Sequence, residues 1–198
     1  MTIAICPGIH SASDTQQAIK ALKAAGLEDE QWWIFPADRH PSYSAPHLFH
    51  FWQQQSSQAV QPNSPLTVIS FSAGVVGAIG AAIAWQAWGG SVQSFIALDG
   101  WGVPLIGTFP IYRLSHDYFT HQSSARLGGG PDSFYADPDI AHLDLWRSPD
   151  TAQGWHIQTH SDSTWGPPTS RRVERRRTTA AQFIVTVAHA PAALGRER

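Results

Sequence analysis

The chain has 198 residues, of which 42% are hydrophobic, and this content suits one folded domain and excludes a disordered chain. No apolar run approaches the ~20 residues of a membrane-spanning helix, and the first residues lack the pattern of a secretory signal, so we expect no membrane insertion. The formal net charge is −2 and the one cysteine excludes an internal disulfide, which together favour a cytoplasmic protein without a nucleic-acid partner.

Short β-rich runs alternate with helical stretches along the chain, as in a mostly parallel sheet covered on both faces. We predict about six strands: Thr2–Cys6, Gln31–Phe35, Leu66–Phe71, Val92–Leu98, Pro110–Leu114 and Ser133–Tyr135. The predicted helices are Thr15–Ala25, Pro46–Gln54, Ala73–Trp88 and Leu143–Trp146. The expected fold class is therefore α/β, a three-layer αβα sandwich.

The C-terminal part has a different composition. The segment Gly154–Ser170 is rich in Trp, His, Ser and Pro, and we predict a loop there. Five arginines follow within Arg171–Arg177, and we interpret them as the solvated start of a last helix rather than as a surface for an anionic partner. That helix is predicted over Thr178–Ala190, although its middle would also suit a strand. We expect one domain over residues 1–190 and a tail over residues 191–198.

The strongest chemical signal is the segment Ser70-Phe71-Ser72-Ala73-Gly74, which lies between the central predicted strand and the longest helix. A serine on a tight strand-to-helix turn projects its hydroxyl clear of the sheet. The turn needs small residues two positions before and two after the serine, and Ser70 and Gly74 meet that need. Free N–H groups at the start of the helix, from Ala73 onward, would stabilise an oxyanion.

This segment resembles the nucleophile elbow of the α/β-hydrolase family, G-x-S-x-G, with Ser70 in place of the first glycine. The resemblance extends from Thr2 to about Ala190 and implies Ser72 as nucleophile, followed along the chain by an acid and a histidine. In such a triad the neutral imidazole takes the serine proton and the carboxylate orients the imidazole. Because Gly100–Phe109 is too short for an inserted lid, the resemblance implies a small, open, esterase-like or lipase-like hydrolase without a cofactor.

Two aspartates and three histidines are candidates for the remaining roles in the triad. We prefer Asp117, just past a predicted strand, as the acid, and Asp99 at the end of the preceding strand is the alternative. We prefer His142 as the base because it alone stands between the last predicted strand and a helix. His116 and His156 are its rivals, and a triad with Asp99 and His156 would also keep the family's order.

The second oxyanion donor would come from the loop after the first strand. The segment Cys6-Pro7-Gly8-Ile9-His10 resembles the family's oxyanion loop, with Cys and Pro before the glycine. The resemblance implies that the backbone N–H of Ile9 or His10 acts together with that of Ala73. An ordinary Pro-Gly turn is the alternative interpretation.

Large and aromatic side chains are expected to border the site. Phe71, Trp101 and His10 are the predicted pocket residues, and they favour a small-molecule ester or thioester with an apolar acyl group. Packing of these rings in the core would explain them equally well. His47 and His50 share one face of a predicted helix but lack a closing ligand set, so we expect no metal site.

Two interpretations from other classes of protein stay open. In the first, Ser72–Gly77 is a degenerate glycine-rich loop of a nucleotide-binding, Rossmann-like protein, and Asp99 binds a ribose. In the second, the chain has the hydrolase fold but is a binding protein without catalysis. Fluorophosphonate labelling of Ser72 and ester turnover by the Ser72→Ala variant distinguish these interpretations from a hydrolase.

Overall fold

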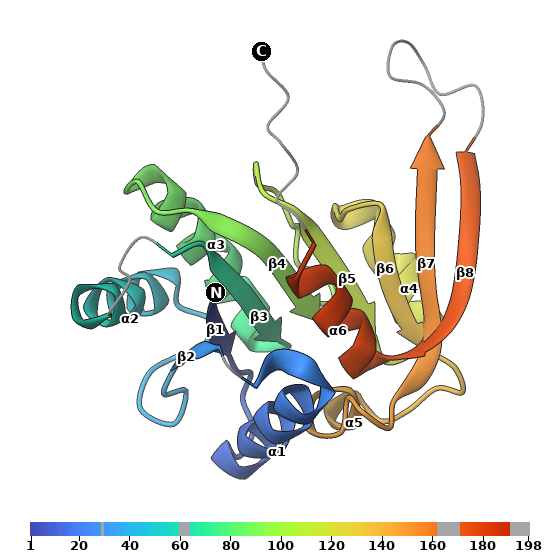
Figure 1. The fold of residues 1–198 in the computed structure, drawn as a ribbon, viewed down its shortest axis with the longest axis horizontal. Coiled ribbons are helices and arrows are strands. Elements are labelled where there is room, and N and C mark those ends of the chain that lie inside the picture. The colour runs from blue at the N-terminus through green and yellow to red at the C-terminus, as the bar shows by residue number, and fades with distance from the viewer. Residues whose placement is uncertain (29, 60–63, 162–170, 191–198) are drawn as a thin grey trace.

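The computed structural model describes residues 1–28, 30–59, 64–161 and 171–190. A sheet runs through the centre of the molecule in the order β2-β1-β3-β4-β5-β6-β7-β8 (Figure 1). The strands are β1 (Thr2–Cys6), β2 (Gln31–Ile34), β3 (Leu66–Phe71), β4 (Val92–Leu98), β5 (Ile111–Ser115), β6 (Asp132–Ala136), β7 (Gln153–Ser161) and β8 (Arg171–Thr179). Neighbours from β2 to β6 pair in parallel, and β6–β7 and β7–β8 pair antiparallel. The predicted α/β class with a mostly parallel sheet is confirmed.

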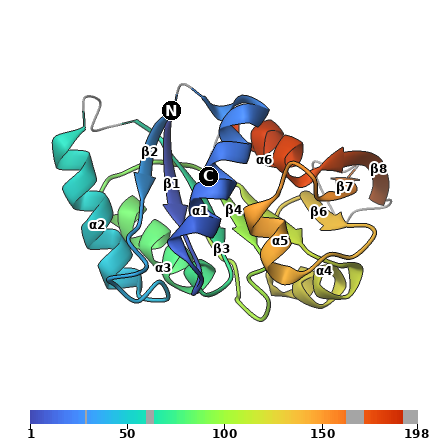
Figure 2. The same cartoon turned by 90° about the horizontal axis from the view of Figure 1, so that it is seen from below.

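Helices cover both faces of the sheet (Figure 2). One face carries α1 (Ala12–Leu22) with η1 (Lys23–Leu27), α5 (His142–Arg147) and α6 (Ala180–Ala188). The other face carries α2 (Ala45–Gln58), α3 (Ala73–Ala87) and α4 (Tyr118–Ser124) with η2 (Ala125–Leu127). None of the helices in the described ranges is both long enough and apolar enough to cross a membrane.

The central strand β3 is buried along its whole length, as expected for a continuous apolar strand covered on both faces. Side chains that alternate along the strands point into two separate cores, one under α1, α5 and α6 and one under α2 and α3. Small residues let α3 lie close to its neighbours, since a Cβ at Gly77 would stand 2.5 Å from the carbonyl oxygen of Ser42. This close packing fixes the helix that begins directly after Ser72.

The C-terminal part differs from the prediction, and the sheet has eight strands rather than about six. Strand β7 occupies residues that the sequence indicated as a loop, and β8 occupies the arginine-rich segment read as the start of a helix. The last helix, α6, begins only at Ala180. The end of the predicted loop at residues 162–170 and the predicted tail at residues 191–198 lie outside the described residues.

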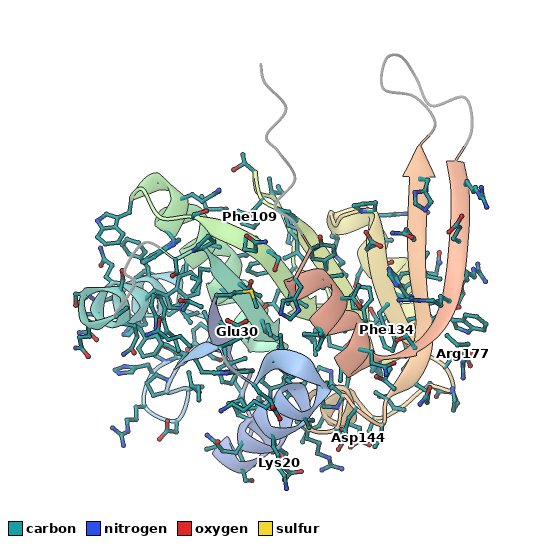
Figure 3. The ribbon with its side chains drawn as sticks, in the orientation of Figure 1. Lys20, Glu30, Phe109, Phe134, Asp144 and Arg177 are labelled. Atoms are coloured by element: carbon teal, nitrogen blue, oxygen red, sulfur yellow. The ribbon has the colours of Figure 1, made fainter. Side chains whose placement is uncertain are left out.

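The arginines of β8 lie on the outermost strand of the sheet, where Arg177 projects from the edge (Figure 3). Arg177 bonds to Asp137 at 3.3 Å and lies over the ring of Trp155 at 5.0 Å, while Arg172 pairs with Glu174 at 3.0 Å. An exposed edge strand needs charged side chains rather than an apolar face. For this reason the segment could not be recognised as a strand from hydrophobic alternation.

Candidate active site

Ser72 occupies a sharp turn between β3 and α3. Its backbone angles are φ 53° and ψ −124°, a region that non-glycine residues seldom adopt. A Cβ at Gly74 would stand 2.3 Å from the carbonyl oxygen of Cys6, so only glycine fits there. Ser70 is fully buried and its hydroxyl donates to the carbonyl of Ile96 at 3.2 Å, which accounts for a serine at the position where the elbow motif has glycine.

The loop after β1 passes directly beside this turn. A Cβ at Gly8 would stand 2.9 Å from the Cβ of Ser72, and Ile9, the next residue, is 79% exposed. Ala73 is the first residue of α3, so its N–H has no acceptor within the helix. The predicted oxyanion residues Ile9 and Ala73 therefore come from two segments that meet at Ser72.

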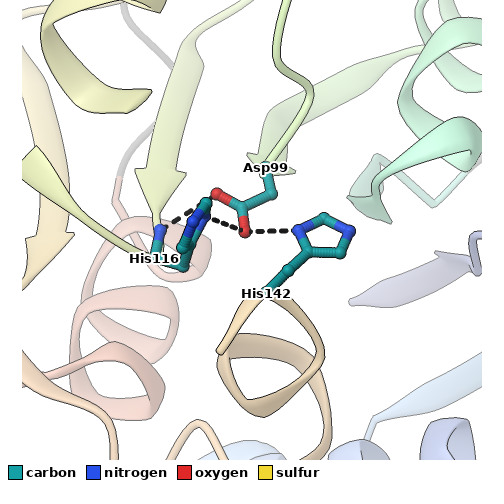
Figure 4. A group of neighbouring side chains, drawn as sticks. All are labelled: Asp99, His116 and His142. Atoms are coloured by element: carbon teal, nitrogen blue, oxygen red, sulfur yellow. Dashed lines mark hydrogen bonds and ion pairs between the residues drawn. The ribbon is translucent and has the colours of Figure 1, made fainter. Parts of the chain in front are cut away.

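His142, the first residue of α5, faces Ser72 across the carboxyl edge of the sheet. Its Nε2 lies 3.1 Å from the Ser72 hydroxyl oxygen. Its Nδ1 lies 2.8 Å from Oδ2 of Asp99, as Figure 4 shows. The imidazole stacks on the ring of Phe71, with centroids 4.7 Å apart. These contacts fix both the position and the plane of the imidazole.

The preference for Asp117 as the acid was wrong in geometry, because the carboxylate that contacts His142 belongs to Asp99. The side chain of Asp99 is 1% exposed and lies directly after β4. Asp117 instead caps the N-terminus of α4, where its Oδ1 accepts the N–H of Thr120 at 2.6 Å. Capping by aspartate is the ordinary role of such a residue before a helix.

A second histidine, His116, lies on the other side of Asp99. Its Nδ1 is 2.9 Å from Asp99 Oδ2, its backbone N–H donates to Asp99 Oδ1 at 2.9 Å, and its Nε2 is 3.3 Å from Asp117 Oδ2. The side-chain hydrogen bond with Asp99 raises the pKa of His116, and the nearby charges of Asp99, Asp117 and Asp139 act in the same direction against partial burial. The sequence indicated His116 only as a rival base, and no pattern in it signals this double contact.

Two of the three predicted pocket residues lie behind the site rather than in it. Phe71 is buried and stacks between His142 and Trp146. His10 meets the edge of Phe71 and bonds through Nε2 to Thr15 Oγ1 at 3.0 Å. Burial lowers the pKa of His10, and the charge of His142 acts in the same direction while Asp14 opposes it. Phe71 thus packs directly against the imidazole of His142, and His10 packs against Phe71.

An open pocket of about 470 Å³ lies over Ser72 and His142. Its walls include Val76, Trp101 and Phe119, which are respectively 48%, 67% and 72% exposed. Trp101 is therefore the predicted pocket residue that lines this space. Apolar side chains of this size, exposed together around a polar centre, are typical of a ligand site.

The ligand atoms of Asp99, His116 and His142 lie within 4.8 Å of one another, which is compatible with a metal ion. Both imidazole Nδ1 atoms already contact the carboxylate, so hydrogen bonding accounts for this arrangement. The other histidine pair that the sequence raised makes local bonds, His47 to Ser44 at 2.8 Å and His50 to Gln54 at 2.9 Å.

The remaining alternatives from the sequence are placed elsewhere. His156, on β7, bonds to Asp132 at 2.7 Å and packs against Phe183, away from Ser72. For the nucleotide-binding interpretation, the turn at Gly74 would have to admit a phosphate. The space in front of Gly74 is filled by the carbonyls of Cys6 and Pro7, so the turn receives the chain's own backbone.

The comparisons with known proteins add little beyond this geometry. No family model matches the sequence, and no curated protein matches it. Among solved structures, the chain is similar to one described as "YbtT - Type II thioesterase from Yersiniabactin NRPS/PKS biosynthetic pathway". The two share 16% sequence identity with a TM-score of 0.49, over 74% of this chain and 88% of the other.

Proposed function

We propose that this protein is a serine hydrolase that cleaves an ester or thioester through an acyl-enzyme on Ser72. His142 is the general base and acid, and Asp99 is the orienting carboxylate. The observation that carries the proposal is the continuous contact from the Ser72 hydroxyl through both nitrogens of His142 to Asp99, with distances of 3.1 and 2.8 Å. This arrangement is the one that nucleophilic catalysis by serine requires.

In the proposed reaction, the Ser72 oxygen attacks the carbonyl carbon while its proton passes to His142 Nε2. Asp99 accepts the Nδ1 proton in a hydrogen bond and stabilises the imidazolium. The oxyanion is held by the N–H groups of Ala73 and Ile9. The bond to the leaving oxygen or sulfur then breaks, and His142 returns the proton to it. Water repeats the sequence on the acyl-enzyme and releases the acid.

An apolar acyl group on a small-molecule substrate suits this site. The apolar lining of the pocket beside Ser72 includes Val76, Trp101, Val103 and Phe119. Its titratable residues, Asp99, His116 and His142, are hydrogen-bonded to one another. Burial of each methylene on such a surface contributes about 0.8 kcal/mol. The expected absence of a cofactor and the cytoplasmic location stay predictions.

Hydrolysis of p-nitrophenyl butyrate by the wild type and by Ser72→Ala, His142→Ala and the double variant tests the proposal. Each single variant should lose about 10³-fold or more in kcat, and the double variant little more, because the two residues act as a unit. The matched controls are Ser57→Ala and His47→Ala, both exposed on α2 and outside the pocket over Ser72, which should keep the wild-type rate.

Labelling by a fluorophosphonate probe, followed by peptide mapping, complements the rate measurement. The probe should modify Ser72 in the wild type and leave the His142→Ala variant largely unmodified. Equal turnover by wild type and Ser72→Ala would refute the hydrolase and favour the binding protein. Quenching of tryptophan fluorescence by NAD(P)H, without labelling, would favour the nucleotide-binding interpretation.

A further inference from the structure

Asp99 contacts two imidazoles, although the proposed mechanism uses one. His142 Nδ1 and His116 Nδ1 meet the same carboxylate oxygen at 2.8 and 2.9 Å, from opposite sides (Figure 4). The backbone N–H of His116 holds the second oxygen at 2.9 Å. Since Asp99 is 1% exposed, water has little access to it, and these contacts determine how the carboxylate is oriented.

His116 is itself held between two carboxylates. Its Nδ1 faces Asp99, and its Nε2 lies 3.3 Å from Asp117 Oδ2. An imidazole donates from both nitrogens only when it is protonated. The hydrogen bond with Asp99 raises the pKa of His116, burial opposes this, and the charges of Asp99, Asp117 and Asp139 add to the rise. The surroundings of His116 therefore favour its cationic form.

The charged groups around His116 come from four parts of the chain. Asp99 follows β4, Asp117 is the N-cap of α4, Asp139 lies in the loop before α5, and His142 is the first residue of α5. Among the groups that face His116, His142 is the one that becomes positive, and its ring centroid is 5.8 Å from that of His116. His10, in the loop after β1, is a further titratable group near His142, and its pKa is lowered by burial and also by the charge of His142. Two cations at this separation repel each other and compete for one carboxylate.

We propose that His116 is a positioning residue that, as an imidazolium held between Asp99 and Asp117, fixes the Asp99 carboxylate and opposes protonation of His142. His142 thereby stays neutral, and able to act as a base, down to a lower pH than it would if Asp99 contacted His142 without His116. The catalytic consequence rests on the proposed function, but the effect on the titration of His142 does not.

The primary test is an NMR titration of histidine-labelled protein, which follows the His142 imidazole directly. Asparagine at position 116 keeps a donor near the place of Nδ1 but removes the charge. In His116→Asn the titration midpoint of His142 should rise by about one pH unit. A midpoint equal to that of the wild type would overturn the inference. This readout decides the inference whether or not the protein turns over any of the esters tried.

The pH dependence of kcat/KM for p-nitrophenyl butyrate supplies the second readout. In His116→Asn the acid limb should move to higher pH by the same amount. The His116→Ala variant also removes the donor, and its rate at alkaline pH should fall several-fold further. A purely structural role would lower the rate at every pH and leave the acid limb in place, and that result would contradict the proposal.

A third variant changes the other carboxylate. Asp117→Asn keeps an N-cap for α4, because asparagine caps a helix as well as aspartate does. Without the negative charge of Asp117 the imidazolium of His116 loses one of its partners, so in the same NMR titration the midpoint of His116 itself should fall. His50→Asn, an exposed histidine on α2, is the matched control and should leave the His142 titration unchanged.

Discussion

Gly74 has no side chain, and this lets the loop after β1 lie against the start of α3. A Cβ there would stand 2.3 Å from the carbonyl oxygen of Cys6 and 2.4 Å from that of Pro7. Both obstacles are backbone atoms, which cannot rotate away as a flexible side chain would. The loop that carries Ile9 therefore keeps its place beside Ser72 because residue 74 has no side chain.

We predict that Gly74→Ala moves this loop and misplaces the Ile9 N–H. Ester hydrolysis should fall about 100-fold, because a displacement of about 1 Å is enough to disturb catalytic geometry. The free energy of unfolding should fall by about 1–3 kcal/mol. Initial rates and urea titrations measure the two effects. In the control Gly129→Ala the new Cβ makes an ordinary 3.7 Å contact with Arg113, so wild-type behaviour is expected.

We expect the acyl group of the substrate to contact the exposed ring of Trp101. We predict that Trp101→Ala lowers the ratio of kcat/KM for p-nitrophenyl octanoate to that for the acetate by about 10-fold, since contact with the distal methylenes is lost. The control is Trp88→Ala, because Trp88 is 54% exposed but lies outside the pocket over Ser72. An unchanged ratio in Trp101→Ala would mean that the acyl chain lies elsewhere.

At single residues the sequence predicted the serine and the imidazole that meet, Ser72 and His142, whereas the carboxylate that contacts His142 is Asp99 rather than the preferred Asp117. Asp99 and Asp117 both follow a strand, and chain order alone does not distinguish them. The signal that separates them is local, since Asp117 stands directly before a helix and three residues before Thr120, whose N–H it caps. Asp99 is directed at His142 by a left-handed backbone, φ 49°, which no side-chain pattern reveals.

Among the elements, the segments around β5 depend on one buried arginine. The guanidinium of Arg113 donates to the carbonyls of Gly100, Val103, Leu127 and Gly128. Burial lowers the pKa of Arg113 to about 10. Through these bonds β5 holds both the segment that presents Trp101 and the turn after α4.

We predict that Arg113→Lys weakens this connection, because an ammonium group offers three donors on one atom instead of a planar fork. The free energy of unfolding should fall by about 2 kcal/mol as carbonyls lose their partners. KM for p-nitrophenyl butyrate should rise more than kcat falls, since Trp101 is displaced while the Ser72–His142 pair is untouched. Arg126→Lys, an exposed neighbour, provides the comparison and should change neither quantity.

The elements that the sequence predicted well are the buried ones. Strands β1, β3 and β4 are mostly apolar and are buried along nearly their whole length because both faces of the sheet are covered there. The hairpin of β7 and β8 lies at the sheet edge and is held by backbone pairing over its full length. Backbone pairing does not require alternating apolar residues, so the sequence of β7 and β8 carries no strand pattern. The prediction of a loop and a helix for these residues was therefore wrong.

For the whole molecule, the strand order explains why residues distant in sequence meet at one edge. Ser72 follows β3, Asp99 follows β4, and His142 follows β6, all of which run in the same direction. Carboxyl ends of parallel strands share one edge of the sheet, where ligands usually bind. The alternation of elements allowed this arrangement to be predicted, whereas the distances between the side chains required the folded structure.

The unusual backbone at Ser72 also implies that stability favours glycine at this position, whereas the proposed reaction needs a serine. An L-amino acid held in a sparsely populated region costs about 1–3 kcal/mol, and glycine escapes most of that penalty. The variants Ser72→Gly and Ser72→Ala both lack the hydroxyl group and differ from each other by one methyl group. The glycine protein should resist urea better than the alanine protein, and better than the natural chain. In that case the native sequence has a lower free energy of unfolding than the glycine variant, and this loss accompanies the placement of a hydroxyl group on the turn between β3 and α3.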